Sequence, residues 1–427
     1  MNRSDMILET LKREVVPAMG CTEPVAVALA CAKAKELKYG VIEDISVKVS
    51  PNIYKNGLAV GIPHTEEVGL FIAAALGIIA GDSEKNLEVL SEIEDREVDS
   101  AKALLKSGKL SLDIADTDEK IYIEVVYKTN GGSSKVIIQG KHNNFTYIDV
   151  DGKALVDDRV ENSTTNSSKN LLYTLPIREI IQVVESMNGN DLEFMLDGFE
   201  MNERIAKKGL ESKLGMGVGY GLQANIEKGI LSDDLHNIAM VLTAAASDAR
   251  MSGTTLPVMS SNGSGNNGLT AILPLVAYSK KIEVDDERMA KSLAISHLIN
   301  SYIKNYIGRL SAICGCGVAA GTGAGAALAW LMGASYDQID GVINNMLANT
   351  SGMVCDGAKV GCALKLATSA SAAVQSALLA LEGSIVPMHN GIVGETVEET
   401  IRNLGIVSDK GMRITDSVIL QVMREMQ

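Results

Sequence analysis

Residues 313–334 read ICGCGVAAGTGAGAALAWLMGA, a stretch with no charged side chain that is built largely of glycine and alanine. Such small side chains let one helix approach its neighbours closely, so the stretch predicts a tightly packed helical core. It also holds Cys314 and Cys316, and the later segment CDGAKVGC holds Cys355 and Cys362. Four of the chain's six cysteines therefore lie beside glycine-rich backbone, where thiolates commonly serve redox, nucleophilic or metal chemistry.

The same stretch is long enough and apolar enough to cross a bilayer, and residues 256–278 are also uncharged. Ser260–Gly268 interrupts this second stretch with SSNGSGNNG, which is the composition of a loop. The flanks show no repeated excess of lysine and arginine of the kind that orients membrane helices. We therefore expect no membrane as a partner.

Charge narrows the partners further. The 427 residues carry a formal net charge of −14, which disfavours nucleic acid and anionic membrane surfaces because both are bound chiefly through lysine and arginine. The N-terminal segment is charged and lacks the apolar stretch of a signal peptide, so we expect a cytoplasmic protein. In that compartment cysteines favour metal binding or catalysis over a disulfide framework.

The hydrophobic pattern divides the chain into three parts. Residues 1–39 predict two N-terminal helices that pack on the catalytic domain. Residues 40–155 show period-two alternation and an Asn130–Gly132 turn between two apolar runs, which predict a small α+β domain with a hairpin. After a polar linker at 155–172, residues 170–427 predict helix after helix. The expected fold class is mainly α with an α+β segment: a large all-helical catalytic domain and a small sheet-containing domain.

The spacing of the four cysteines can supply a metal site. Cys355 and Cys362 would lie about 10 Å apart along a continuous helix, but the glycines between them permit a loop that brings the sulfurs together. With a sulfur from Cys314 or Cys316, this makes three ligands for a [4Fe–4S] cluster and leaves one iron open to substrate. Inert buried cysteines fit the spacing equally well. A structural zinc fits it less well, because paired C-x₂-C knuckles are missing.

Two further residues are candidates for proton transfer. Cys21 lies in the turn GCTEP at a predicted helix start, where the helix dipole lowers a thiol pKa and suits the thiol to act as base or nucleophile. The alternative is a capping turn formed by Thr22 and Glu23. Lys359 falls between the last two of the four cysteines, where it could orient a carboxylate or act as a base, or be an ordinary surface lysine.

A third feature is the segment that precedes the apolar helix LTAILPLVAY. Consecutive backbone N–H groups and a hydroxyl at a helix start make a cradle for a carboxylate or a phosphate. The segment is not a Walker A loop, because the terminal Lys-Ser/Thr is missing; a flexible linker is the alternative. The candidate substrate-binding residues are Ser264, Gly265, Asn266, Asn267 and Gly268.

These motifs extend along nearly the whole chain: EVVPAMGCTEP at 14–24, KNG at 55–57, VGIP at 60–63, SGNNG at 264–268, CGCGVAA at 314–320, NTSGMVCDGAK at 349–359 and GCALK at 361–365. Jointly they resemble the L-cysteine desulfidase family, which is related to the alpha part of iron–sulfur-dependent L-serine dehydratases. The resemblance implies an oxygen-sensitive [4Fe–4S] cluster held by three cysteines. It also implies PLP-independent β-elimination of L-cysteine to pyruvate, ammonia and hydrogen sulfide.

The resemblance carries over residue by residue. Cys355 matches the cysteine of the family's Cys-Asp-Gly/Pro motif, Cys362 matches the next ligand, and the first ligand is either Cys314 or Cys316. The SGNNG segment matches the one that holds the substrate carboxylate in serine dehydratases. Cys21 matches the thiol of the N-terminal motif and is the candidate for proton transfer.

The expected partner is a small amino acid, and so apolar a helical domain is compatible with a homodimer. Within the same class, the alternative is an L-serine dehydratase or a related amino- or hydroxy-acid lyase with the same cluster. A PLP enzyme is a separate alternative, with the SGNNG segment as phosphate cup and Lys359 or Lys365 as the Schiff-base lysine. A membrane or metal-sensing protein that uses the same cysteines without turnover is the non-enzyme alternative.

Overall fold

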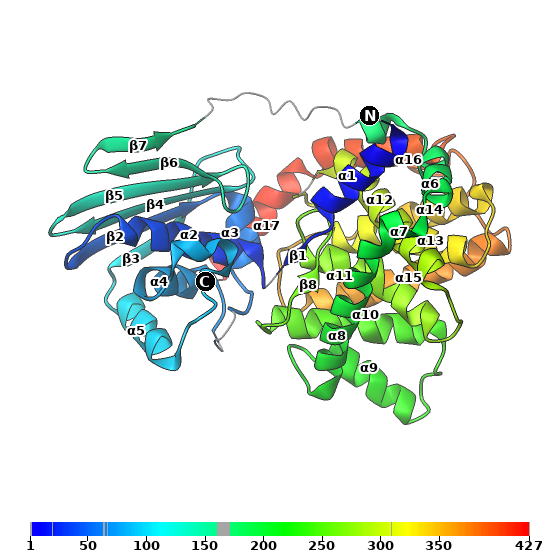
Figure 1. Cartoon of the computed structure of the whole chain (residues 1–427), viewed down its shortest axis with the longest axis horizontal. Helices are drawn as coiled ribbons and strands as arrows, with labels where there is room; N and C mark the ends of the chain where they lie inside the picture. Colours follow the sequence, from blue (N-terminus) through cyan, green and yellow to red (C-terminus); the bar gives the residue numbers. More distant parts are fainter. Residues whose placement is uncertain are drawn as a thin grey trace.

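The computed structural model describes residues 2–18, 20–62, 65, 67–159, 171–308 and 310–426. The protein has two lobes (Figure 1), each with its own hydrophobic core, one around a six-stranded sheet and the other among helices. The predicted fold class, mainly α with a small α+β part, is confirmed. Most of the predicted linker, at 160–170, lies outside the described residues.

The sheet is made of β2 (Ile42–Val49), β3 (Leu110–Ile114), β4 (Tyr122–Thr129), β5 (Gly132–Gln139), β6 (Phe145–Val150) and β7 (Lys153–Asp157). Its strand order is β3-β2-β4-β5-β6-β7, with β2 and β3 parallel and the other neighbouring pairs antiparallel. Thr129 pairs with Gly132 across the two-residue turn between β4 and β5, so the predicted hairpin is confirmed.

The helices of this lobe are α2 (Thr22–Glu36), α3 (Pro51–Gly57), α4 (Leu70–Ile79), α5 (Asp95–Lys106) and the 3-10 helix η1 (Ser83–Glu88). One face of the sheet is apolar: alternate side chains such as Val47 of β2 and Val125 of β4 are fully buried. Helix α2 packs on β4 and β5, and α4 packs on α2. Covering one face of a largely antiparallel sheet leaves the other face to solvent, as period-two patterning predicts.

The helical lobe is larger. Its helices are α1 (Arg3–Glu14), α6 (Ile177–Ser186), α7 (Gly189–Leu192), α8 (Leu196–Glu211), α9 (Val218–Glu227), α10 (Leu235–Met251), α11 (Gly265–Ser279), α12 (Asp286–Ile307), α13 (Gly321–Leu331), α14 (Tyr336–Thr350), α15 (Cys362–Leu381) and α16 (Val397–Ile406). The single turns η2 (Leu171–Thr174) and η3 (Glu193–Met195), the π-helical turns η4 (Cys316–Ala320) and η5 (Val407–Gly411), and the last helix α17 (Arg413–Glu425) complete the chain.

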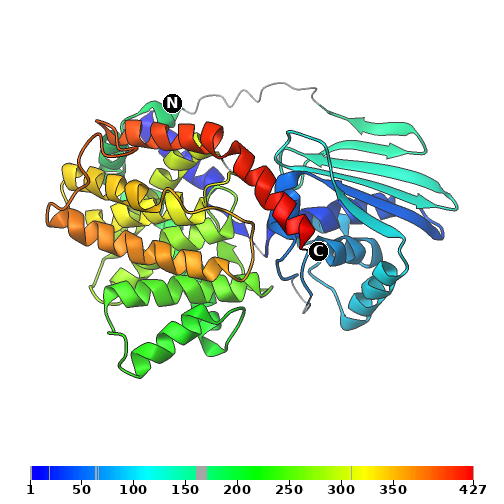
Figure 2. The ribbon, with the colours of Figure 1, turned by 180° about the vertical axis from the view of Figure 1, so that it is seen from behind.

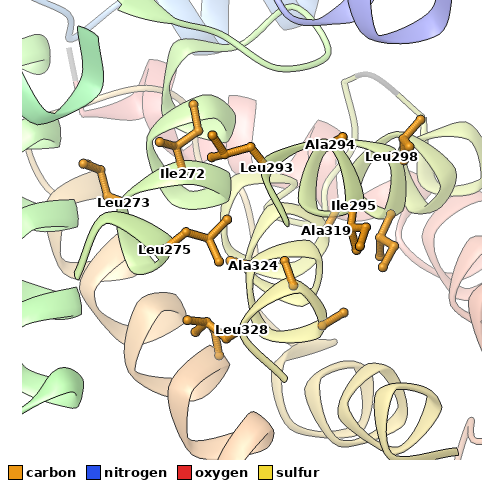
Figure 3. Packing of buried hydrophobic residues seen from close by; sticks show 14 of the residues in the cluster. Ile272, Leu273, Leu275, Leu293, Ala294, Ile295, Leu298, Ala319, Ala324 and Leu328 are labelled. Carbon is orange, nitrogen blue, oxygen red and sulfur yellow. The ribbon is translucent and has the colours of Figure 1, made fainter. Parts of the chain in front are cut away.

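Helices α11, α12 and α13 meet in the middle of this core. Figure 3 shows Leu275 of α11, Leu293 of α12 and Leu328 of α13 among the buried side chains there. A Cβ atom at Gly323 of α13 would overlap the carbonyl oxygen of Ser296 of α12, so the two backbones can cross this closely only at glycine. The close packing predicted from the small residues of the 313–334 stretch is confirmed.

The two N-terminal helices separate, although we expected both to pack on the helical domain. Ile7 and Leu11 of α1 belong to the helical core, whereas α2 belongs to the core of the sheet lobe. Because α2 is buried on nearly all sides, its pattern contains no polar face that could indicate its neighbours. The C-terminal helix crosses back (Figure 2): Leu420 of α17 is buried in the core of the sheet lobe.

One described helix, α15, is long and apolar enough to cross a membrane, and 56% of its most apolar window is buried inside the protein. Helices α10, α13 and α14 pack against it. The uncharged stretch that raised the membrane question, 313–334, forms a short extended segment, the turn η4 and helix α13. This stretch is almost entirely buried in the helical core.

Candidate functional site

A small apolar cluster joins the two lobes at the candidate site. It consists of Cys21, Val60 and Met251, with Ala358 and Cys362 packed against it. The short strand β1 (Pro17–Ala18) pairs with β8 (Val258–Met259), which brings the Cys21 turn beside the loop before α11. Three of the predicted motifs therefore meet at one place, although they are far apart in the sequence.

Backbone pairing brings two of the cysteines together. The N–H of Cys314 donates to the carbonyl oxygen of Met353 at 2.8 Å, and the N–H of Cys355 donates to that of Ala312 at 2.7 Å. These two bonds form an antiparallel bridge between the C-x-C turn and the segment after α14. Cys314 and Cys355 thus lie diagonally across this bridge, with Cys314 buried and Cys355 partly buried.

The other two cysteines close the group. Cys316 begins the π-helical turn η4, and its Sγ lies 3.7 Å from the hydroxyl of Ser264. Cys362 is the first residue of α15, and its Sγ lies 3.7 Å from the carbonyl oxygen of Gly357. The glycine-containing segment between Cys355 and Cys362 is a loop, as the spacing predicts.

The pKa values of these thiols show how close they are. A hydrogen bond to Cys316, followed by burial, raises the pKa of Cys314 well above its ordinary value. Burial raises the pKa of Cys355, and the neighbouring Cys314 adds to that shift. Burial raises the pKa of Cys362 to about 11, and Cys314 and Cys355 add to it as well. These raised pKa values favour the thiol form of Cys314, Cys355 and Cys362 at neutral pH.

Cys21 shows the same effect, which corrects the prediction of a lowered thiol pKa at this helix start. Burial raises the pKa of Cys21 to about 11, although the guanidinium of Arg250 acts to lower it. Desolvation of the thiolate outweighs both the helix dipole and the neighbouring cation. The N-cap residue of α2 is Cys21 and not Thr22, which is the first residue of the helix, and the Cys21 side chain makes no capping hydrogen bond.

Lysines surround the cysteine group. Lys304 of α12 is 5% exposed, and a Cβ at Gly315 would lie 2.8 Å from its Nζ, so its ammonium lies directly against the C-x-C turn. Burial lowers the pKa of Lys304 to about 8, while Cys316 and Cys355 act to raise it. A buried ammonium at this position compensates negative charge on the sulfurs.

Two more lysines hold the loop that follows Cys355. Lys55 of α3 is 2% exposed; its Nζ donates to the carbonyl oxygen of Cys355 at 3.3 Å and to Oδ1 of Asp416 at 2.6 Å. Lys365 of α15 donates to the carbonyl oxygen of Val354 at 2.7 Å and pairs with Asp356. Lysines from both lobes therefore fix the backbone on either side of this cysteine.

Lys359, a predicted catalytic residue, lies at the edge of the group. Its side chain is 30% exposed and pairs with Asp356. Burial acts to raise the pKa of Asp356, but the hydrogen bonds from Lys359 and Lys365 outweigh it and lower the pKa to about 2. In this structure Lys359 holds a loop carboxylate.

The predicted substrate-binding segment lies at the start of α11. Ser264 is the N-cap residue, and its hydroxyl accepts a hydrogen bond from the N–H of Asn267 at 3.4 Å. Asn266 and Asn267 are 4% and 2% exposed, and Oδ1 of Asn267 has no hydrogen-bond partner among the described residues. Gly268 packs so closely on β8 that a Cβ there would overlap the carbonyl oxygen of Met259. The segment is a buried, rigid helix start and not a flexible linker.

Arg250, at the end of α10, was not predicted from the sequence. Its Nη2 donates to the carbonyl oxygen of Gly20 at 2.8 Å, and its Nη1 donates to Oδ1 of Asn266 at 3.0 Å. The guanidinium therefore ties the Cys21 turn to the start of α11. The sequence signal was a single arginine near the end of an alanine-rich helix, AMVLTAAASDARM, whose other charged residue is Asp248.

A buried polar face of α12 was also missed. Its members, His297, Asn300, Ser301 and Lys304, follow the i, i+3, i+4, i+7 spacing of one helix face, and each is at most 5% exposed. The hydroxyl of Ser261, in the segment before α11, lies 2.9 Å from Nδ1 of His297 and accepts from Nδ2 of Asn300 at 2.9 Å. Helix α12 thus holds the segment before α11 in place through hydrogen bonds to Ser261.

A cleft of about 1240 Å³ opens between the lobes on the side of α17. Lys120, Arg413 and Asp416 line it, together with Ser311 and Ala312, which directly precede the C-x-C turn. The cleft therefore reaches the segment before the C-x-C turn. Asp416 at its wall forms an ion pair with Lys55, which contacts Cys355.

Comparison with known proteins agrees with this arrangement. The serine dehydratase alpha chain family matches residues 84–421, a span that contains the four clustered cysteines and the start of α11. The chain belongs to this family. Its relatives include a UPF0597 protein of Alkaliphilus metalliredigens, 61% identical over 426 residues that cover 99% of this chain and 95% of the relative.

Two more relatives extend the comparison. A UPF0597 protein of Clostridioides difficile is 57% identical over 98% of this chain and 99% of its own length. A UPF0597 protein of Clostridium tetani is 43% identical over 99% of each chain. Membership of the serine dehydratase alpha chain family relates the protein to the lyases. This membership agrees with the family resemblance seen in the sequence. It does not identify cysteine as the substrate.

Proposed function

We propose that this protein is an iron–sulfur lyase that converts L-cysteine to pyruvate, ammonia and hydrogen sulfide. The observation that carries the proposal is the convergence of four cysteines and a buried anion-binding helix start at one place between the lobes. Membership of the serine dehydratase alpha chain family supports the reaction class.

The residues present suit a [4Fe–4S] cluster. In the described part of the chain, no three His, Cys, Asp or Glu side chains converge on one point that could hold a single metal ion. A four-iron cluster makes a different demand, because each thiolate binds its own iron. Thiols are the ligands that such clusters take, and loss of their protons on binding would offset the raised pKa values. The bound cluster would supply a Lewis-acidic iron.

We assign the three ligands to Cys314, Cys355 and Cys362. The N–H of Cys314 donates to Met353, two residues before Cys355, and Cys314 acts electrostatically on both Cys355 and Cys362. Cys316 instead faces the hydroxyl of Ser264. This assignment chooses between the two sulfurs of the C-x-C turn, which the spacing alone leaves open.

The chain's own residues account for binding of the carboxylate and protonation of the leaving sulfide. A base takes the Cα proton, the electron pair of that bond forms the double bond between Cα and Cβ, and the Cβ–sulfur bond breaks with its electron pair leaving on sulfur. The resulting aminoacrylate tautomerises and hydrolyses to pyruvate and ammonia. The start of α11 would hold the carboxylate, and its N–H groups would stabilise negative charge that develops there. Cys21 is the proposed proton-transfer group; as a buried thiol it is suited to give a proton to the departing sulfide.

L-Serine dehydratase is the second candidate function, because the matching family takes its description from that activity. Soft iron binds sulfur well, which favours cysteine as substrate over serine. A PLP enzyme is disfavoured by the contacts of the two lysines it would need. Both Lys359 and Lys365 pair with Asp356 on the cysteine loop, away from the start of α11.

The test is anaerobic purification followed by measurement of iron and acid-labile sulfide per chain. We expect a broad visible absorption that bleaches in air, with sulfide released from cysteine faster than pyruvate is formed from serine. Cys355→Ala and Cys362→Ala should lose most of the iron. Cys31→Ala is the matched control, because Cys31 is buried in the sheet lobe. A colourless enzyme that retains activity would refute the cluster.

The C-x-C turn needs its own pair of variants. Cys314→Ala should lose iron to the same extent as Cys355→Ala, whereas Cys316→Ala should retain it. Retention in the first variant together with loss in the second would reverse the assignment. A borohydride-sensitive lysine adduct would instead favour the PLP alternative.

A further inference from the structure

Arg250 is a buried cation that forms hydrogen bonds to neutral groups among the described residues. Its side chain is 6% exposed, and its acceptors are the carbonyl oxygen of Gly20 and the side-chain oxygen of Asn266. Among the described residues, no carboxylate forms an ion pair with it. Buried charges in proteins are normally paired, because an isolated charge is costly to desolvate. An anion bound beside this guanidinium would therefore be favoured.

The guanidinium still has donors to offer. An arginine carries five N–H groups; the bonds to Gly20 and Asn266 use two of them, and the thiol of Cys21 is a third partner. Its Nε is buried without a hydrogen-bond partner. A Cβ at Gly265 would lie 2.7 Å from Cζ and would overlap Nε, so Nε faces the first residue of α11. Glycine at this position lets the backbone at the start of α11 pack directly against the guanidinium.

The start of α11 points donors into the same space. The first N–H groups of a helix have no partner within the helix. Ser264 takes the N–H of Asn267. The N–H groups of Gly265 and Asn266 make no hydrogen bond to any described residue. A buried cation and two free backbone donors at a helix start are the components of a carboxylate site.

We propose that Arg250, with the N–H groups of Gly265 and Asn266, binds the α-carboxylate of the amino-acid substrate. The inference deepens the proposed function and rests on it for the identity of the substrate. Arg250 would select substrates that carry a free carboxylate. It lies beside the thiol of Cys21, and Ser264, at the start of α11, contacts Cys316. Arg250 is thus a specificity-determining residue and not a proton carrier.

Calorimetric titration with L-alanine tests the site without turnover, since alanine has no leaving group. L-Alaninamide serves as the matched ligand without the carboxylate charge. The native protein should bind alanine and not alaninamide, and Arg250→Gln should bind alanine about 10- to 100-fold more weakly. Arg250→Lys keeps the charge but loses the fork geometry and should fall between them. Equal binding of alanine and alaninamide by the native protein would overturn the proposal.

Kinetics and metal content separate this inference from the proposed function. In Arg250→Gln, KM for cysteine should rise about 10- to 100-fold, with iron and sulfide per chain unchanged. Arg288→Gln is the control: Arg288 donates to the carbonyl oxygen of Leu331 at 2.8 Å, at the opposite end of α12 from the site. Normal KM and normal alanine binding in Arg250→Gln would refute the carboxylate site and leave the lyase proposal intact. If alanine binding depended on Arg250 but the protein had no lyase activity, the carboxylate site would stand and the lyase proposal would be refuted.

Discussion

His297 makes the stability of the helical lobe depend on pH. The side chain is fully buried in α12, where burial lowers its pKa to about 3, and its Nδ1 lies 2.9 Å from the hydroxyl of Ser261. In the unfolded chain the pKa of histidine is about 6.5. Below that pH His297 binds a proton in the unfolded chain but stays neutral in the folded protein, so acid favours unfolding. The stabilisation is fully present above pH 6.5 and is lost progressively as the pH falls toward 3.

The magnitude follows from this difference in pKa. Each pH unit below about 6.5 costs about 1.4 kcal/mol of folding free energy, which amounts to about 2 kcal/mol between pH 7 and pH 5. His297→Gln removes the titrating ring and keeps a hydrogen-bonding side chain. The variant should be less stable than the native protein at pH 7, and this deficit should shrink by about 2 kcal/mol at pH 5.

Urea titration followed by tryptophan fluorescence measures this effect. Trp330 is the chain's one tryptophan, it lies on α13, and its Nε1 donates to Glu185 at 2.7 Å, so it reports on the helical lobe. His389→Gln is the control, because His389 is 72% exposed. If the native protein and His297→Gln lost the same free energy of unfolding between pH 7 and pH 5, the argument from burial would be refuted.

Two further predictions concern the packing around the site. Gly268→Ala should destabilise the protein by about 1–3 kcal/mol, because the new Cβ would overlap the carbonyl oxygen of Met259. The control is Gly221→Ala in α9, where the new Cβ would meet no atom within 4 Å. This control should be neutral or stabilising in the same urea titration. Asp416→Asn should lower the urea midpoint, because it leaves the buried Lys55 without its counter-charge. The double variant Asp416→Asn/Lys55→Met should recover part of this loss. If the double variant lost as much stability as the single variant, the proposed pairing would be contradicted.

Local chemistry explains what the sequence predicted well. The hairpin at Asn130–Gly131 is specified by residues that suit a tight turn, and the close crossing at Gly323 is specified by the run of small side chains around it. Ser264 was recognisable as part of a helix start because serine at the N-cap position satisfies a free N–H group. In each case the residue types within one short segment are enough to predict the local feature.

The missed features depend on contacts between distant segments. Helix α2 is apolar all round, so no pattern could show that it packs on the sheet and not on the helical lobe. Arg250 and Lys304 resemble the ordinary charged residues that helices present to solvent, until the fold places them 6% and 5% exposed beside the cysteine group. The raised pKa of Cys21 has the same origin, because burial is a property of the tertiary structure.

The charges around the site suggest why it lies between the lobes. Lys55 comes from the sheet lobe and Lys304, Lys365 and Arg250 come from the helical lobe, so two independently packed cores contribute cations to one small volume. Burying this many positive charges within a single core would be costly without anions to compensate them. Asp416 offsets the charge of Lys55 from α17, and Asp356 offsets that of Lys365 from the cysteine loop. The proposed thiolate ligands and the substrate carboxylate are further anions whose binding Lys304 and Arg250 would favour.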